Sequence, residues 1–336
     1  MSKVLVTGAS GFIAKHILRE LFAAGHEVRA TVRSDRRKGE LEALFAGQPI
    51  EYAFLDLTSD EGWEEAMQGC DVLMHTASPF PMAEPKDPQD LIRPAVDGTL
   101  RALRAARAAG INRVILTSSC AAIYKDASKP KGELSDERHW TTPDSPLVGA
   151  YEASKTLAER AAWDFVAEHP DMALTTINPG GVFGPALDAH YGTSLDLVAR
   201  VMSGSDPVAP PLQLPLVDVR DVAMMHVKAI DLEAAKGERF AATVETLRFV
   251  EMAQAIKAWD PSLKVATSEA PGWLMRIFAL FMPEARALMR NVGVNLAVSG
   301  AKAERVFGFT YIPARDSILA AAECIRAFDA SRSETG

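Results

Sequence analysis

Short apolar runs alternate with stretches of helical periodicity through the first half of the chain. Apolar runs of four to six residues predict buried strands, and their alternation with helices is typical of βαβ units. The predicted strands are Val4–Thr7, Glu27–Val32, Tyr52–Leu55, Val72–Thr76, Val114–Thr117 and Leu174–Ile177. The predicted helices between them include Lys15–Ala24, Trp63–Gln68 and Pro94–Ala109. The pattern therefore predicts an α/β fold with a doubly wound parallel sheet.

A glycine-rich turn, Thr-Gly-Ala-Ser-Gly-Phe-Ile-Ala at residues 7–14, directly follows the first predicted strand. Its glycines allow the backbone to turn and to approach a pyrophosphate, and the small Ala14 allows close packing of helix on strand. The free amides at the start of the next helix favour an anion. We therefore expect a dinucleotide site here rather than an ordinary tight turn. The candidate cofactor-binding residues of the turn are Gly8, Ser10, Gly11, Phe12 and Ile13.

The regular alternation of short apolar runs and helical patterns ends after about residue 180. Prolines cluster at Pro207–Pro215, and helical patterns at Arg220–Leu232 and Phe249–Trp259 flank a predicted strand at Arg239–Thr243. We expect residues 1–180 to form the dinucleotide-binding domain, with 217–245 returning to it. Residues 181–216 and 246–330 are then expected to form a smaller C-terminal substrate-binding lobe.

The end of the second predicted strand bears on the choice of dinucleotide. Sites that prefer NAD place an acidic residue there, whereas this chain has Arg33, 25 positions after Gly8. A guanidinium at this position suits the 2′-phosphate of NADP(H). Arg36 and Arg37 are competing candidates, and the neighbouring Asp35 complicates the assignment.

Tyr151 and Lys155 are four residues apart in Tyr-Glu-Ala-Ser-Lys, so a helix places them on one face. A nearby ammonium is expected to lower the pKa of the phenol, which is otherwise about 10, toward a range useful for proton transfer. A Thr-Ser-Ser segment lies upstream and Asn-Pro-Gly downstream, which makes the pair far more specific than Tyr-x-x-x-Lys alone. This combination predicts hydride and proton transfer.

Composition limits the other possibilities. The 336 residues are 48% hydrophobic and carry a formal net charge of −8, so a large core is expected and nucleic-acid binding is not. The three cysteines are far apart, and the histidines lack ligand spacing, so we expect reduced thiols and no metal. His75 is expected to be a hydrogen-bonded structural histidine. The chain shows no secretory or membrane-spanning segment, which favours the cytoplasm.

Several motifs together resemble an extended short-chain dehydrogenase/reductase, of the NAD-dependent epimerase/dehydratase superfamily. They are TGASGFIA at 7–14, LTSS at 116–119, YEASK at 151–155, NPGGVFGP at 178–185 and VDVRDVA at 217–223. The branch of dihydroflavonol reductases, cinnamoyl-CoA reductases and bacterial aldehyde/ketone reductases is indicated by ATVRS at 30–34, HTASPF at 75–80 and PAVDGTL at 94–100. The resemblance implies a Rossmann fold.

The resemblance also implies roles for individual residues. Ser119 would orient the substrate carbonyl, with Ser118 as the alternative, and Lys155 would also hold the nicotinamide ribose. Lys38 matches a second 2′-phosphate contact, and Ser194 is a weaker phosphate-contact candidate. The other matched cofactor positions are Asp56 and Leu57 at the adenine, Thr76, Ala77 and Ser78 under the riboses, and Pro179, Gly180 and Val182 at the nicotinamide.

We expect an NADPH-dependent reductase of an aldehyde or ketone, with catalytic residues Ser119, Tyr151 and Lys155. The substrate is expected to be a small apolar or aromatic carbonyl compound, because the regions expected to line its pocket (79–82, 120–124, the segment after 184, and 273–289) are mostly apolar. Residues 273–289 could instead be core or a subunit contact, or a lid. The enzyme is expected to be a monomer or homodimer. A nucleotide-sugar epimerase/dehydratase, a 3β-hydroxysteroid-type dehydrogenase and a non-catalytic redox sensor are the alternatives.

Overall fold

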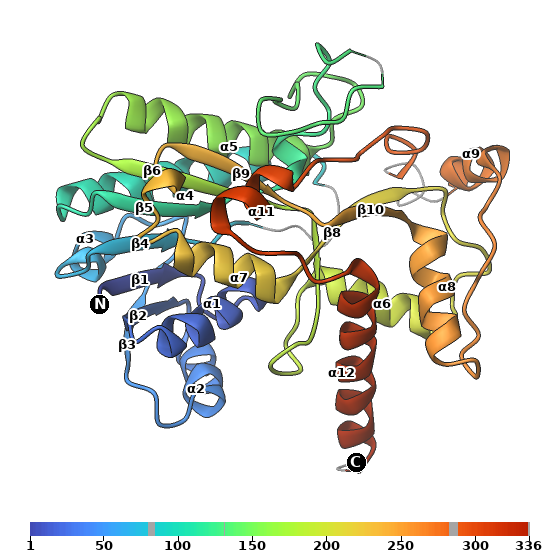
Figure 1. The fold of residues 1–336 in the computed structure, drawn as a ribbon, viewed down its shortest axis with the longest axis horizontal. Coiled ribbons are helices and arrows are strands. Elements are labelled where there is room, and N and C mark those ends of the chain that lie inside the picture. The colour runs from blue at the N-terminus through green and yellow to red at the C-terminus, as the bar shows by residue number, and fades with distance from the viewer. Residues whose placement is uncertain (80–84, 131, 282–287, 335–336) are drawn as a thin grey trace.

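A seven-stranded sheet forms the centre of the molecule, with every neighbouring pair of strands parallel (Figure 1). The computed structural model describes residues 1–79, 85–130, 132–281 and 288–334. The strand order is β3-β2-β1-β4-β5-β6-β9, so the direction of winding reverses between β1 and β4. The strands are β1 (Lys3–Thr7), β2 (Glu27–Val32), β3 (Ile50–Phe54), β4 (Val72–His75), β5 (Arg113–Thr117), β6 (Ala173–Pro179) and β9 (Glu238–Ala242).

Helices cover both faces of this sheet. This explains the continuous apolar runs of the strands, since both faces of the sheet are covered. In β1, for example, Val4, Leu5 and Val6 are fully buried. One face packs on α1 (Phe12–Ala23), α2 (Asp35–Leu44) and α7 (Val219–Lys228). The other face packs on α3 (Trp63–Met67), α4 (Gln89–Ala108) and α5 (Ala150–Ala167).

A second sheet and its helices form a separate hydrophobic cluster in the C-terminal part (Figure 1). Its strand order is β10-β8-β7, with β10 and β8 antiparallel and β7 and β8 parallel. The strands are β7 (Gly181–Phe183), β8 (Gln213–Asp218) and β10 (Glu245–Arg248). Helices α6 (Thr193–Ser203), α8 (Phe249–Trp259) and α12 (Ala314–Glu334) pack in this cluster. Helix α11 (Ala301–Phe307) packs in the core of the main sheet instead, and α9 (Gly272–Phe281) lies between α8 and α11 in the chain.

The α/β fold and its doubly wound parallel sheet are confirmed. The six strands expected in the first half are present, and the strand expected at 239–243 is β9, which extends the main sheet beside β6. Within 217–245, α7 packs on the main sheet, whereas β10 pairs with β8. The division of the chain into a dinucleotide-binding domain and a substrate lobe stays a prediction.

Helix α9 differs from one expectation. Trp273, Ile277 and Phe281 are 64%, 44% and 81% exposed, so these side chains are not core. These three residues follow one another at intervals of four on a face that points to solvent, whereas Met275 of the same helix is buried. Residues 282–287, and residues 80–82 of the expected substrate pocket, lie outside the described residues.

The described residues include no helix with the length and apolar character needed to span a bilayer. In the same part of the chain, no cluster of three or more His, Cys, Asp or Glu side chains is arranged to hold a metal ion.

Candidate active site

The glycine-rich turn joins β1 to α1 at the carboxyl edge of the sheet. Gly8 has φ of +63°, and a Cβ there would lie 3.0 Å from the Cα of Ala77. The Gly8 amide donates to Thr31 Oγ1 at 3.2 Å, and the Gly11 amide donates to the Gly8 carbonyl at 2.9 Å. Gly11 precedes α1 and provides no side-chain cap, so amides at the start of this helix remain available to a ligand.

Ser119, Tyr151 and Lys155 come together from two elements. Ser119 follows β5, while Tyr151 lies in the first turn of α5 and Lys155 one turn later. The Ser119 side chain hydrogen-bonds the phenol of Tyr151. The ammonium of Lys155 is 5.9 Å from the centre of the Tyr151 ring, and the lysine is 9% exposed. The three side chains can therefore act on one small group.

Burial has the largest effect on the pKa values of Tyr151 and Lys155. It raises the pKa of Tyr151 to about 12, against a hydrogen bond from Ser119 that lowers it. It also lowers the pKa of Lys155 to about 8, against the negative charge of Glu159 that raises it. The expected lowering of the phenol pKa by Lys155 is therefore wrong for this structure. The phenolate would lose its hydration, and this cost exceeds the stabilisation by its neighbours.

The two serines after β5 face different partners. Ser118 Oγ donates to Glu159 Oε2 at 2.6 Å, in the protein interior. Ser119 Oγ accepts from the Ala121 amide at 3.1 Å, in addition to its bond with Tyr151. The geometry places Ser119, and not Ser118, beside the phenol.

A cavity of about 290 Å³ joins the turn to these side chains. Most of the predicted site residues line it. They are Gly8, Gly11, Phe12, Ile13, Thr76, Ser78, Ser119, Tyr151, Lys155, Pro179, Gly180, Val182 and Ser194, together with Ser118. Sequence reasoning missed Gly192 and Thr193 at the start of α6, although a glycine before a helical pattern marks such a start.

Six of the predicted residues lie outside this cavity. Ala77 packs against Gly8 and restricts the turn, as described above. Leu57 packs against Gly98 of α4. The half-buried Ser10 lies within the turn itself. The remaining three are Arg33, Lys38 and Asp56, near the carboxyl ends of β2 and β3.

The cations after β2 differ in their partners. Arg37 and Arg36 both pair with Glu40, at 2.8 and 3.4 Å, and Lys38 pairs with Glu42 at 3.7 Å. Arg33 is exposed, and within the described part of the chain no carboxylate lies within ion-pairing distance of it. Hydrogen bonds from Thr58, and then the charge of Arg33, lower the pKa of the exposed Asp56.

His75 at the end of β4 is buried, and its Nδ1 hydrogen-bonds Thr7 Oγ1 at 2.9 Å. Burial, together with the positive charge of Lys155, lowers the pKa of His75 to about 3. The ring is therefore neutral, as a structural histidine would be.

The model of the NAD dependent epimerase/dehydratase family matches residues 4–242. The chain belongs to this family. A ketoreductase, azaE, of Aspergillus niger is 36% identical over 296 residues, which cover 80% of this chain and 86% of that protein. Cinnamoyl-CoA reductase CAD2 of Medicago truncatula is 35% identical over 271 residues, covering 78% and 82%.

Among solved structures, this chain is similar to the yeast methylglyoxal/isovaleraldehyde reductase Gre2 complexed with NADPH. The TM-score is 0.82 at 29% identity, over 98% of this chain and 99% of that one. The extended short-chain dehydrogenase/reductase resemblance is thereby confirmed, and the protein is an oxidoreductase of the reductase branch.

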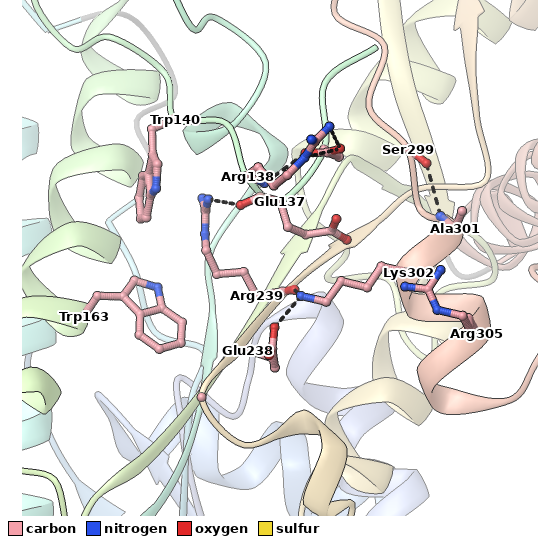
Figure 2. Close-up of a pocket in the computed structure, with 12 residues that line it drawn as sticks. Glu137, Arg138, Trp140, Trp163, Glu238, Arg239, Ser299, Ala301, Lys302 and Arg305 are labelled. Carbon is pink, nitrogen blue, oxygen red and sulfur yellow. Dashed lines mark hydrogen bonds and ion pairs between the residues drawn. The ribbon is translucent and has the colours of Figure 1, made fainter. Parts of the chain in front are cut away.

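A larger cavity, of about 590 Å³, lies outside this site (Figure 2). It is formed by residues 136–140, the start of β9 and helix α11, and it contains none of the predicted site residues. Two of its lining side chains, Trp163 and Arg239, donate hydrogen bonds to Glu159.

Proposed function

We propose that the protein uses NADPH to reduce a small apolar or aromatic aldehyde or ketone to the alcohol, with Tyr151 as the proton donor. The observation that carries this proposal is the single cavity shared by the glycine-rich turn and the Ser119–Tyr151–Lys155 group. The named relatives, a ketoreductase, a cinnamoyl-CoA reductase and an NADPH-complexed aldehyde reductase, support the same reaction class.

The residues present fit the dinucleotide. Gly8, Gly11 and Gly192 line the cavity without side chains, and the start of α1, which has no side-chain cap, lies beside it. The pyrophosphate would be held there, with Ser194 at the start of α6 as a further contact. Lys155 would hold the nicotinamide ribose. Pro179, Gly180 and Val182 would line the nicotinamide, and Thr76, Ala77 and Ser78 the riboses.

Arg33 is the best 2′-phosphate ligand among the four cations after β2. Arg36, Arg37 and Lys38 each already pair with a glutamate, so a phosphate would compete with an existing carboxylate. Arg33 has no such competitor among the described residues, and a guanidinium matches the geometry of a phosphate. Lys38 would make a secondary contact, and Asp56 and Leu57 would border the adenine.

When bound, NADPH would supply the hydride that the carbonyl carbon accepts. Negative charge then develops on the carbonyl oxygen, where Ser119 and Tyr151 can both donate hydrogen bonds. With a pKa of about 12, the phenol of Tyr151 is protonated at neutral pH and therefore starts as an acid. Its proton passes to the oxygen, the positive charge of Lys155 stabilises the resulting phenolate, and water restores the proton.

The cavity favours an uncharged substrate. Lys155 is the one charged side chain among its described lining residues, so a sugar-nucleotide diphosphate would find no cluster of cations there. Phe12, Ile13 and Val182 contribute apolar surface.

The proposal is tested by mixing purified protein with NADPH and a panel of aromatic aldehydes, ketones, β-ketoesters and acyl-CoA thioesters. Stoichiometric consumption of NADPH with formation of the alcohol is expected for the aldehydes or ketones. Cofactor that stays bound through gel filtration, with no net consumption on any carbonyl compound, would instead favour an epimerase and refute the proposal.

A further inference from the structure

Glu159 is a buried carboxylate on the same face of α5 as the proposed proton donor. Tyr151, Lys155 and Glu159 follow one another at intervals of four residues, so their side chains form one column along the helix. Glu159 is 1% exposed. Removing a carboxylate from water costs free energy, so a buried carboxylate needs hydrogen-bond donors or positive charges around it.

Five side chains supply that compensation, and they come from four elements. Ser118 Oγ and Asn178 Nδ2 each donate to Oε2 at 2.6 Å. Arg239 Nε donates to Oε1 at 2.6 Å, with further bonds to this oxygen from Thr176 Oγ1 at 3.1 Å and Trp163 Nε1 at 3.3 Å. The carboxylate is thus fixed against the ends of β5, β6 and β9.

Arg239 is held in turn by the wall of the larger cavity. Its Nη1 donates to the carbonyl oxygens of Glu137 and His139, at 2.6 and 2.9 Å, and its guanidinium stacks 3.5 Å from the centre of the Trp140 ring. Figure 2 shows this side chain directed toward Trp140, with the bond to Glu137 drawn. Because Arg239 is anchored in this way, Glu159 has little freedom to move toward or away from Lys155.

We propose that Glu159 is a positioning residue, whose fixed negative charge keeps Lys155 an ammonium beside Tyr151 while the enzyme works. The inference rests on the proposed function, because the role of Lys155 as a cation beside Tyr151 is part of that function. Glu159 does not itself line the cavity; it reaches the site through its charge on Lys155 and through the hydrogen bond from Ser118, which does line it.

The other charged or titratable groups around Lys155 do not replace Glu159. His75 of β4 is neutral and Tyr151 of α5 is protonated at neutral pH. Burial raises the pKa of the Cys120 thiol after β5, so it is neutral as well. Arg239 of β9 is a cation and therefore cannot favour protonation of the lysine. Burial lowers the pKa of Lys155 to about 8, and the negative charge of Glu159 acts against it and raises that pKa.

The experiment compares the alkaline limb of the pH profile of kcat/KM in four proteins. Removing the carboxylate with Glu159→Gln should move the limb to lower pH by about one unit, because a nearby opposite charge shifts a pKa by on the order of one unit. Removing the cation with Arg239→Gln should move the limb to higher pH, because Glu159 then acts on Lys155 alone. Trp163→Phe removes one donor to Glu159 without changing any charge, and its limb should match the wild type.

Opposite shifts in the first two variants support the inference, since a purely structural role would lower activity without moving the limb in opposite directions. Wild-type limbs in both would overturn it. Glu159→Gln leaves Arg239 buried without its counter-ion, so the double variant Glu159→Gln/Arg239→Gln serves if the single one does not fold. It should show the shift to lower pH, and a wild-type limb there refutes the inference. If neither the Glu159→Gln protein nor the double variant folds, the Arg239→Gln protein decides: a shift of its limb to higher pH supports the inference, and a wild-type limb refutes it.

The dissociation constant of NADPH, followed by fluorescence over the same pH range, provides a readout that needs no substrate. Binding should weaken as Lys155 loses its proton, with the same ordering of the variants. If the wild type turns over no carbonyl compound, the proposed function fails while this measurement still tests Glu159. If turnover is normal and neither profile moves in the variants, the inference on Glu159 fails alone.

Discussion

Tyr151→Phe tests the proton donor with a change of one oxygen atom. The ring and its packing stay, while the hydroxyl that bonds Ser119 is lost. A positioned general acid contributes about a hundredfold to ten-thousandfold to rate. We therefore expect kcat/KM for carbonyl reduction to fall by that factor, about 3 to 5.5 kcal/mol of transition-state stabilisation. NADPH affinity should stay within a few-fold, because Lys155 and the glycine-rich turn are unchanged.

The same reasoning predicts the pH dependence of the wild type. Since the pKa of Tyr151 is about 12, the phenol keeps its proton throughout the range in which the protein is assayed. The lysine has a pKa of about 8, so its ammonium form predominates below that pH and is lost as the pH rises through it. Reduction should therefore decline above about pH 8 through Lys155, not through the tyrosine.

The assay follows NADPH absorbance with an aldehyde identified from the panel, together with NADPH titration by fluorescence. Tyr52→Phe is the matched control. Its hydroxyl is buried without a hydrogen-bond partner in the described residues, and it lies on β3 away from the cavity. Activity of this control should equal the wild type. A Tyr151→Phe protein that keeps more than about a tenth of the wild-type kcat/KM would refute the assignment of the general acid.

Two further substitutions test the cofactor site. Arg33→Asp should lower the preference for NADPH over NADH by about tenfold to a hundredfold, the worth of a charged hydrogen bond. The same change at Arg36, which is 73% exposed at its side chain and pairs with Glu40, should leave the preference near the wild type, and equal effects would point away from Arg33. Gly8→Ala should destabilise the protein in urea by about 1–3 kcal/mol more than Gly25→Ala. Both glycines have positive φ, but only at Gly8 would the new Cβ meet other atoms, and equal losses would show that the close approach is unimportant.

Features of the site that depend on neighbours along the chain were predictable. The glycine-rich turn, the shared face of Tyr151 and Lys155, and the strand before Ser119 each follow from local spacing, because backbone geometry repeats over a few residues. Membership of the reductase branch followed from the same motifs, and the comparisons confirm it. Arg33 was a candidate for the phosphate contact on local grounds as well, because it directly follows the second predicted strand.

Other features depended on residues that are distant in sequence. Glu159 and Arg239 are 80 positions apart, and no local pattern joins them. The resemblance already favoured Ser119 over Ser118, but the contact of Ser118 with that carboxylate depends on the packing of α5 against the sheet. The direction of the Tyr151 pKa shift was wrong when inferred from the adjacent lysine alone. Periodicity specifies which side chains share a face, whereas hydration and charge depend on everything that packs against that face. Those quantities are therefore properties of the folded molecule, in which the strands and helices have excluded water from the site.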